Sequence, residues 1–91
     1  MIARSARARR NDVDICADIL GVAERGARKT RIVYRANLNF DVVKKYLERL
    51  IESDLIRRTD DLHYETTEKG VKFLEGYREL LAPDMRYGNN F

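Results

Sequence analysis

The stretch GARKTRIVYRANLNFDVVKKYL, residues 26–47, carries the strongest structural signal in the chain. Its centre, Asn37-Leu38-Asn39, separates two segments whose apolar residues recur at helical spacing. Asn37 can adopt the left-handed conformation that stops a helix, and Asn39 can cap the next helix with its side chain. Leu38 can turn into the core between them. Two helices joined by so short a turn form a helix-turn-helix.

The apolar positions of these two helices predict which faces are buried. Thr30 is expected to cap a short helix over residues 31–36, and Asn39 a longer one over residues 40–53. The positions expected to face inward are Ile32, Val33 and Ala36 in the first helix, and Val43, Tyr46, Leu47, Leu50 and Ile51 in the second.

Another helix is expected ahead of this motif, over residues 12–24. Asn11 can cap it, and Asp14 places a carboxylate near its positive end. Gly26 is expected to end it, because glycine readily adopts the backbone conformation found after a helix. Residues 27–29 are long enough only for a short bridging strand.

After the motif, the pattern predicts a β-hairpin and a last helix. Residues 55–58 and 63–66 have the composition of two short strands joined by a tight tip. Thr67 is expected to cap a helix over residues 68–81, which Pro83 stops. A strand pair directly after a helix-turn-helix forms a wing. The predicted fold class is therefore mainly α with a small antiparallel hairpin, a winged helix.

Composition divides the chain into three parts. Residues 1–10 hold four arginines and no acid and are expected to form a flexible basic arm, residues 11–82 the winged-helix domain, and residues 83–91 a polar tail. Residues 25–35 hold five cations and no acid, whereas residues 36–91 hold nine basic and eleven acidic side chains. Such asymmetry is typical of proteins that bind nucleic acid or anionic lipid, although most charge runs are simply solvated surface.

The totals restrict the classes of function. With 91 residues, 44% of them hydrophobic, the chain has room for one modest core but not for a deep catalytic cavity. The only cysteine, Cys16, is interpreted as a small buried hydrophobe, and the only histidine, His63, as a strand residue. We therefore expect no enzyme, no cofactor and no metal. Without an apolar run long enough to span a membrane, or a signal peptide, a cytoplasmic, nucleoid-associated protein is expected.

The run KTRIVYRANLNFDVVKKYLERLIESDLI, residues 29–56, followed by YETTEKGVKFLEGY, residues 64–77, closely resembles a family of small archaeal winged-helix proteins. That family includes predicted transcription regulators and small chromatin-associated proteins, which dimerise through an antiparallel coiled coil of their last helices. The chain departs from it in two places. Pro83 would make any coiled coil shorter, and the hairpin tip carries Asp60-Asp61 where a wing that touches phosphate would be expected to present cations.

The motif and the resemblance together predict binding to double-stranded DNA. The second helix of a helix-turn-helix fits the major groove, where Lys donates to guanine and Asp or Glu accepts from cytosine. The preceding helix crosses the backbone, where cations neutralise phosphates. The residues expected at the DNA are Arg28, Lys29, Thr30, Arg31, Arg35, Asn39, Asp41, Lys44, Lys45, Glu48, Arg49, Arg57 and Arg58.

Three functions remain open on this surface. The first is a transcription regulator that reads a sequence, which the mixture of acids and bases on the second helix favours. The second is an architectural chromatin protein with little sequence preference. The third is a protein–protein adaptor, for which the acidic wing and the acidic helix face are the supporting features.

The last helix has a wider apolar stripe than a helix that covers one domain needs. This width predicts a homodimer, and the alternative is a helix that packs only on its own domain. The interface residues expected for a dimer are Phe73, Leu74, Tyr77, Leu80 and Leu81.

Overall fold

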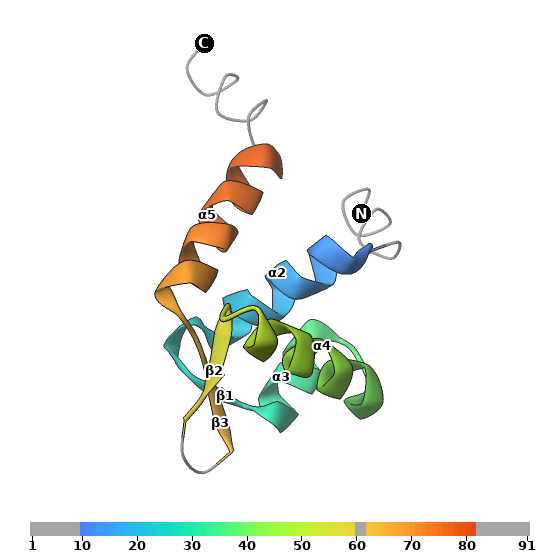
Figure 1. The fold of residues 1–91 in the computed structure, drawn as a ribbon. Helices are drawn as coiled ribbons and strands as arrows, with labels where there is room; N and C mark the ends of the chain where they lie inside the picture. The colour runs from blue at the N-terminus through green and yellow to red at the C-terminus, as the bar shows by residue number, and fades with distance from the viewer. Residues whose placement is uncertain (1–9, 60–61, 82–91) are drawn as a thin grey trace.

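The computed structural model describes residues 10–59 and 62–81 (Figure 1). Its elements, in chain order, are α2 (Asp12–Val22), the short 3-10 helix η1 (Ala23–Arg25), β1 (Ala27–Arg28), α3 (Lys29–Ala36), α4 (Phe40–Glu52), β2 (Ile56–Arg58), β3 (His63–Thr66) and α5 (Glu68–Leu81). The three strands form one antiparallel sheet in the order β1-β3-β2. Four helices with this small sheet, in this order, confirm the predicted winged helix.

The turn between α3 and α4 has the predicted chemistry. Asn37 takes the left-handed conformation, with φ 58° and ψ 52°, at the end of α3. The amide of Leu38 then donates to the carbonyl of Val33 over 3.1 Å. The side-chain oxygen of Asn39 accepts from the amide of Val42 over 2.8 Å and caps α4. The reversal of the chain is therefore specified by local residues on both sides of the turn.

The start of α3 differs from the prediction, and Thr30 is not its cap. The helix begins at Lys29, its N-cap position is Arg28, and no side chain caps it. The physical reason is the pairing of β1 with β3, which places Arg28 opposite His63 and holds it extended. The helix therefore begins directly after the strand, and Thr30 lies exposed within its first turn.

The wing is a tight antiparallel hairpin. Ile56 pairs with Thr66 and Arg58 with Tyr64. The amide of Thr59 donates to the carbonyl of His63 over 2.8 Å and closes the hairpin below the tip. Asp60 and Asp61, on which the expectation of an acidic wing rests, lie outside the described residues, as do the tail and most of the N-terminal arm.

The core lies where α2, α3, α4, β2 and α5 meet. The largest fully buried side chains are Ile19, Leu20, Ile32, Val43, Ile56 and Leu74. Two expectations about burial were wrong. Ile51 is 40% exposed, because it falls at the margin of the apolar stripe of α4, whereas Leu74, expected at a dimer interface, is only 1% exposed and belongs to this core.

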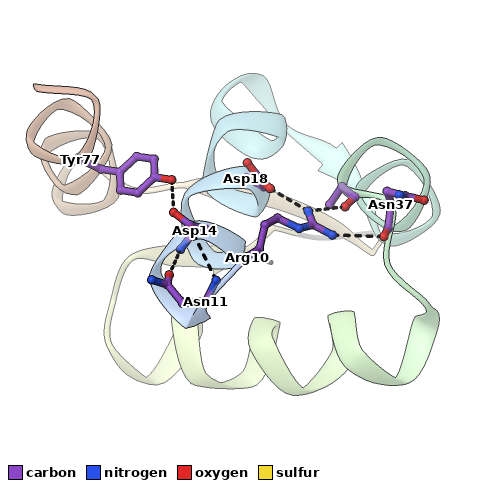
Figure 2. A network of polar contacts seen from close by, with 7 residues as sticks. Arg10, Asn11, Asp14, Asp18, Asn37 and Tyr77 are labelled. Carbon is purple, nitrogen blue, oxygen red and sulfur yellow. Dashed lines mark hydrogen bonds and ion pairs between the residues drawn. The ribbon is translucent and has the colours of Figure 1, made fainter. Parts of the chain in front are cut away.

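The last helix is anchored at its base and projects away from the sheet and α4 (Figure 1). Thr67 caps it as predicted, because its hydroxyl accepts from the amide of Gly70 over 3.0 Å. One turn beyond Leu74, the hydroxyl of Tyr77 donates to Asp14 in α2 (Figure 2). Asp14 also completes a capping box with Asn11 at the start of α2. Asp14 therefore both caps α2 and holds α5 against it through Tyr77.

Candidate nucleic-acid interface

The outer face of α4 carries both signs of charge and is exposed to solvent. Asp41, Lys44, Lys45 and Glu48 occupy its first turns, and none of them makes an ion pair with any residue in the described ranges, 10–59 and 62–81. The opposite face buries Val43, Tyr46, Leu47 and Leu50 in the core. Because the apolar face of α4 is packed in the core, the orientation of the helix is fixed and its charged face points to solvent, where it can contact a ligand.

Arg49 does not belong to this outer face. Its guanidinium lies 3.8 Å from the carboxylate of Asp12 and 5.3 Å from the centre of the Tyr46 ring. The hydroxyl of Tyr46 donates to the same carboxylate over 2.5 Å, and this hydrogen bond, more than burial, raises the pKa of Tyr46. Arg49 therefore lies on the flank of α4 that faces α2, in a cluster that joins the two helices.

The basic stretch before the turn is divided between two faces of α3. The ammonium of Lys29 lies 5.7 Å from the centre of the Phe40 ring, so Lys29 extends toward the start of α4. Arg31 and Arg35, by contrast, line a cleft of about 580 Å³ whose other walls come from α2 and α5. The sequence assigned Lys29, Arg31 and Arg35 to one DNA-binding surface, and of these three only Lys29 lies beside α4.

Two exposed aromatic side chains accompany these cations, and the sequence pattern had assigned neither of them a role. Tyr34 is 85% exposed on the outer side of α3, and Phe40 is 50% exposed at the first position of α4. The exposure of Tyr34 could have been predicted from the helical spacing, because Tyr34 lies on the face of α3 opposite the buried Ile32 and Ala36.

In the wing, the two predicted arginines have different surroundings. Arg57 lies 2.9 Å from the carboxylate of Glu65 on the paired strand, in an exposed cross-strand ion pair. Arg58 is exposed and has no such partner within the described part of the chain. Of the two, only Arg58 is without an ion-pair partner among residues 10–59 and 62–81.

Arg10, expected in the flexible arm, is instead built into the domain (Figure 2). Its guanidinium lies 2.7 Å from Asp18 in α2 and donates to the carbonyls of Ala36, over 2.7 Å, and Asn37, over 3.3 Å. A cation at the C-terminal end of α3 stabilises the exposed carbonyls of that end. Arg10 therefore clamps the turn of the helix-turn-helix to α2.

The predicted dimer residues are spread over the length of α5. Phe73 and Tyr77 are partly buried against the core, whereas Leu80 and Leu81 are 79% and 61% exposed. With Leu74 in the core, the apolar surface that remains uncovered lies in the last turn of the helix.

Three other features could indicate a function within residues 10–59 and 62–81: a metal site, a reactive thiol and a helix that could span a membrane. No three side chains of His, Cys, Asp and Glu gather in these ranges in a way that could hold a metal ion. Cys16 is half-buried, and burial raises the pKa of its thiol, which disfavours the reactive thiolate. No helix in the same ranges is both long enough and apolar enough to cross a membrane.

The geometry defines a helix-turn-helix domain with a β-hairpin wing, and the chain belongs to the winged helix-turn-helix family, whose model matches residues 9–83. Two similar archaeal proteins come from Methanocaldococcus jannaschii. The uncharacterized protein MJ0290 is 35% identical over 80 residues, and this match spans 84% of the chain but only 37% of that protein. The uncharacterized protein MJ0287 is 33% identical over 78 residues, covering 85% of the chain and 79% of that protein.

Solved structures with the same fold include a described DNA-binding protein. Sso10a-2, a DNA-binding protein from Sulfolobus solfataricus, superposes with a TM-score of 0.72 at 30% identity, covering 89% of this chain and 88% of that chain. ZitR from Lactococcus lactis, in apo form, superposes with a TM-score of 0.58 at 22% identity, covering 99% of this chain and 74% of that chain. The second likeness concerns the fold alone.

Proposed function

We propose that this protein binds double-stranded DNA as a transcription regulator, with α4 in the major groove. Lys44 and Lys45 would meet phosphates or guanine acceptors, and Asp41 and Glu48 could accept from cytosine. Lys29 and Arg28, at the start of α3, would contact the backbone beside the groove. The likeness to Sso10a-2, named as a DNA-binding protein, supports this assignment.

One observation carries the proposal. The four charges on the outer face of α4, Asp41, Lys44, Lys45 and Glu48, have no ion-pair partner in the part of the domain that the structure describes, whereas Arg10, Arg49, Arg57 and Arg78 are each paired with a carboxylate. A bare helix face of mixed charge, on the second helix of a helix-turn-helix, is suited to reading base edges. Acids placed among the lysines would weaken a purely nonspecific contact with phosphates.

We further propose that the protein acts as a homodimer through the exposed end of α5. Leu80 and Leu81 stand on adjacent positions of a helix that projects from the domain, and both are largely open to solvent. Burying them against a second copy would remove this apolar surface from water. A two-fold dimer would place two α4 helices on one duplex, as in other helix-turn-helix proteins.

The test is a DNA titration with two charge-matched double variants. Lys44→Gln with Lys45→Gln removes two cations from α4, and Lys69→Gln with Lys72→Gln removes two from α5. We expect the parent to bind mixed-sequence duplex at about 50 mM salt and to lose affinity steeply by about 200 mM. The α4 variant should bind more weakly, and its salt slope should fall by about one for each phosphate that is no longer neutralised. The α5 variant should match the parent.

Each alternative corresponds to a distinct result. Equal weakening by both variants would show that net charge, and not the α4 surface, drives binding. A selection from random duplexes that yields no enriched sequence would favour an architectural protein. If the parent does not bind duplex DNA at about 50 mM salt, the DNA proposal is wrong and the adaptor function takes its place.

A further inference from the structure

The cleft between α2, α3 and α5 has an apolar floor and a cationic rim. Val22 from α2 and Leu74 and Tyr77 from α5 line its floor, and Arg25, Arg31 and Arg35 line its rim. Its volume of about 580 Å³ falls in the range of sites for small organic molecules. This cleft is separate from the outer face of α4, on which the proposed DNA binding rests, and it borders the proposed dimer contact at Leu81.

The carboxylates of the cleft are already engaged with other arginines. Asp18 lies 2.7 Å from Arg10, and Glu24 lies 3.6 Å from Arg78. Arg25, Arg31 and Arg35 are exposed and make no ion pair within residues 10–59 and 62–81. The cleft therefore has an excess of positive charge that no described residue neutralises.

Two of these arginines repel each other in the free protein. Arg31 and Arg35 are one turn apart on α3, where like charges destabilise a helix. An anion held between them would relieve this repulsion. Guanidinium groups bind carboxylate and phosphate in a planar, bidentate geometry, which suits them to this role.

The apolar floor of the cleft favours a ligand whose remaining part, beyond the acid group, is apolar. Leu74 is 1% exposed, and Tyr77 is fixed by the hydrogen bond from its hydroxyl to Asp14, so the apolar wall is preformed. The space beside Gly21 in this wall is free, because a Cβ built there would meet only the guanidinium of Arg78, at 3.6 Å. A ring or short acyl chain can lie on this floor while its acid group reaches the rim.

We propose that this cleft binds a small amphiphilic organic anion, an aromatic or acyl carboxylate, with the acid group on Arg31 and Arg35. The bound molecule would touch α2, α3 and α5 together and so hold the projecting helix against the helix-turn-helix. The ligand site does not depend on DNA binding, and it can be tested without DNA.

The experiment is an NMR titration of the ¹⁵N-labelled full chain with 4-phenylbutyrate, followed at the amides of Gly21 and Gly26. The neutral 4-phenylbutyramide tests the apolar body alone, and inorganic phosphate tests the anion alone. We expect saturable shifts with 4-phenylbutyrate and affinities at least about tenfold weaker with each of the two controls, because each lacks one half of the recognition.

Three variants locate the site. Arg31→Gln with Arg35→Gln should weaken binding by about tenfold or more, since it removes charge-assisted hydrogen bonds. Gly21→Leu should also weaken it, because the new side chain fills the cleft while every cation remains. Lys44→Gln with Lys45→Gln, an equal change of charge outside the cleft, should leave the affinity unchanged.

The proposal is overturned if 4-phenylbutyrate causes no saturable shift. It is also overturned if the amide binds as tightly as the acid, or if the lysine variant weakens binding as much as the arginine variant does. A folded Gly21→Leu protein that binds normally would place the ligand outside the cleft and would equally refute the assignment.

Discussion

Gly70 lies directly against the backbone of Leu55. A Cβ built on Gly70 would come within 2.1 Å of the Leu55 carbonyl oxygen and within 2.6 Å of the Thr66 methyl carbon. The same carbonyl accepts a hydrogen bond from the amide of Thr67 over 3.0 Å. The last helix can therefore join the wing at this angle only if its third residue has no side chain.

Gly70→Ala should destabilise the domain. The added methyl group has to push against backbone, which cannot move aside as a flexible side chain can, and overpacking of this kind costs about 1–3 kcal/mol. Urea unfolding followed by circular dichroism measures the change in the free energy of unfolding. Gly76→Ala is the matched control, because a Cβ at Gly76 meets nothing within 4 Å. The control should gain up to about 1 kcal/mol from helix propensity, and equal stability of the two variants would contradict the close approach.

The pair of Arg10 and Asp18 should contribute measurably to stability. Their side chains are only 17% and 16% exposed, so solvent screens the pair poorly. In a double-mutant cycle with Arg10→Met and Asp18→Asn, we expect a coupling energy of about 1–2 kcal/mol. Methionine keeps most of the aliphatic packing of the arginine.

The exposed pair of Arg57 and Glu65 provides the control for that cycle. Their side chains are 65% and 38% exposed, and such surface pairs contribute about 0–1 kcal/mol. Arg57→Met and Glu65→Gln should therefore show a smaller coupling energy than the Arg10 cycle in the same urea titrations. A coupling energy for Arg10 no larger than this one would show that the clamp contributes nothing specific.

The hydrogen bond from Tyr46 to Asp12 should make stability depend on alkaline pH. The bond requires the protonated hydroxyl, and it raises the pKa of Tyr46 above the ordinary value of 10.0. Its contribution is fully present below pH 10, and it is lost as the pH rises toward the raised pKa, because the unfolded tyrosine ionises first. At pH 7, Tyr46→Phe should lower the free energy of unfolding by about 1 kcal/mol, and this difference should shrink above pH 10. Tyr34→Phe, at an 85% exposed position, should show no such dependence, and a difference for Tyr46 that stays constant with pH would contradict the assignment.

The exposed end of α5 should decide the oligomeric state. Leu80→Gln with Leu81→Gln should give a folded monomer, since neither side chain contributes to the core. Sedimentation equilibrium gives the mass, and circular dichroism confirms the fold. Leu62→Gln, at a 58% exposed position in the wing, should leave the dimer intact. If the parent is already monomeric at about 100 µM, a concentration well above typical micromolar affinities, the dimer proposal fails.

Local sequence was sufficient wherever one residue and its near neighbours specify the backbone. Asn37 stops α3, Asn39 caps α4 and Thr67 caps α5, all as predicted. Of the five positions that the apolar spacing predicted to be buried in α4, four are buried and only Ile51 is not. These features depend on contacts within a few residues or on a regular period, and both can be read along the chain.

The candidate site could be predicted only in part, because residue type does not give the direction of a side chain in the folded domain. Lys44 and Lys45 were expected on an exposed face and lie there. Arg31 and Arg35 had the same charge and lie in the same motif, but they line the cleft between α2, α3 and α5. Arg49 was expected at DNA, and the structure places its guanidinium 3.8 Å from the carboxylate of Asp12, which lies far earlier in the chain.

The order of the elements, most of their caps and most of the buried helix positions follow from the amino-acid sequence alone, because short-range hydrogen bonds and apolar periodicity govern all three. Tertiary packing sets which of the described charges remain without an ion-pair partner. It joined Arg10 to Asp18 and to the end of α3, moved Leu74 into the core, and formed the cationic cleft. Those outcomes depend on contacts between segments that lie far apart in the chain, and such contacts cannot be read from local residue type or apolar spacing.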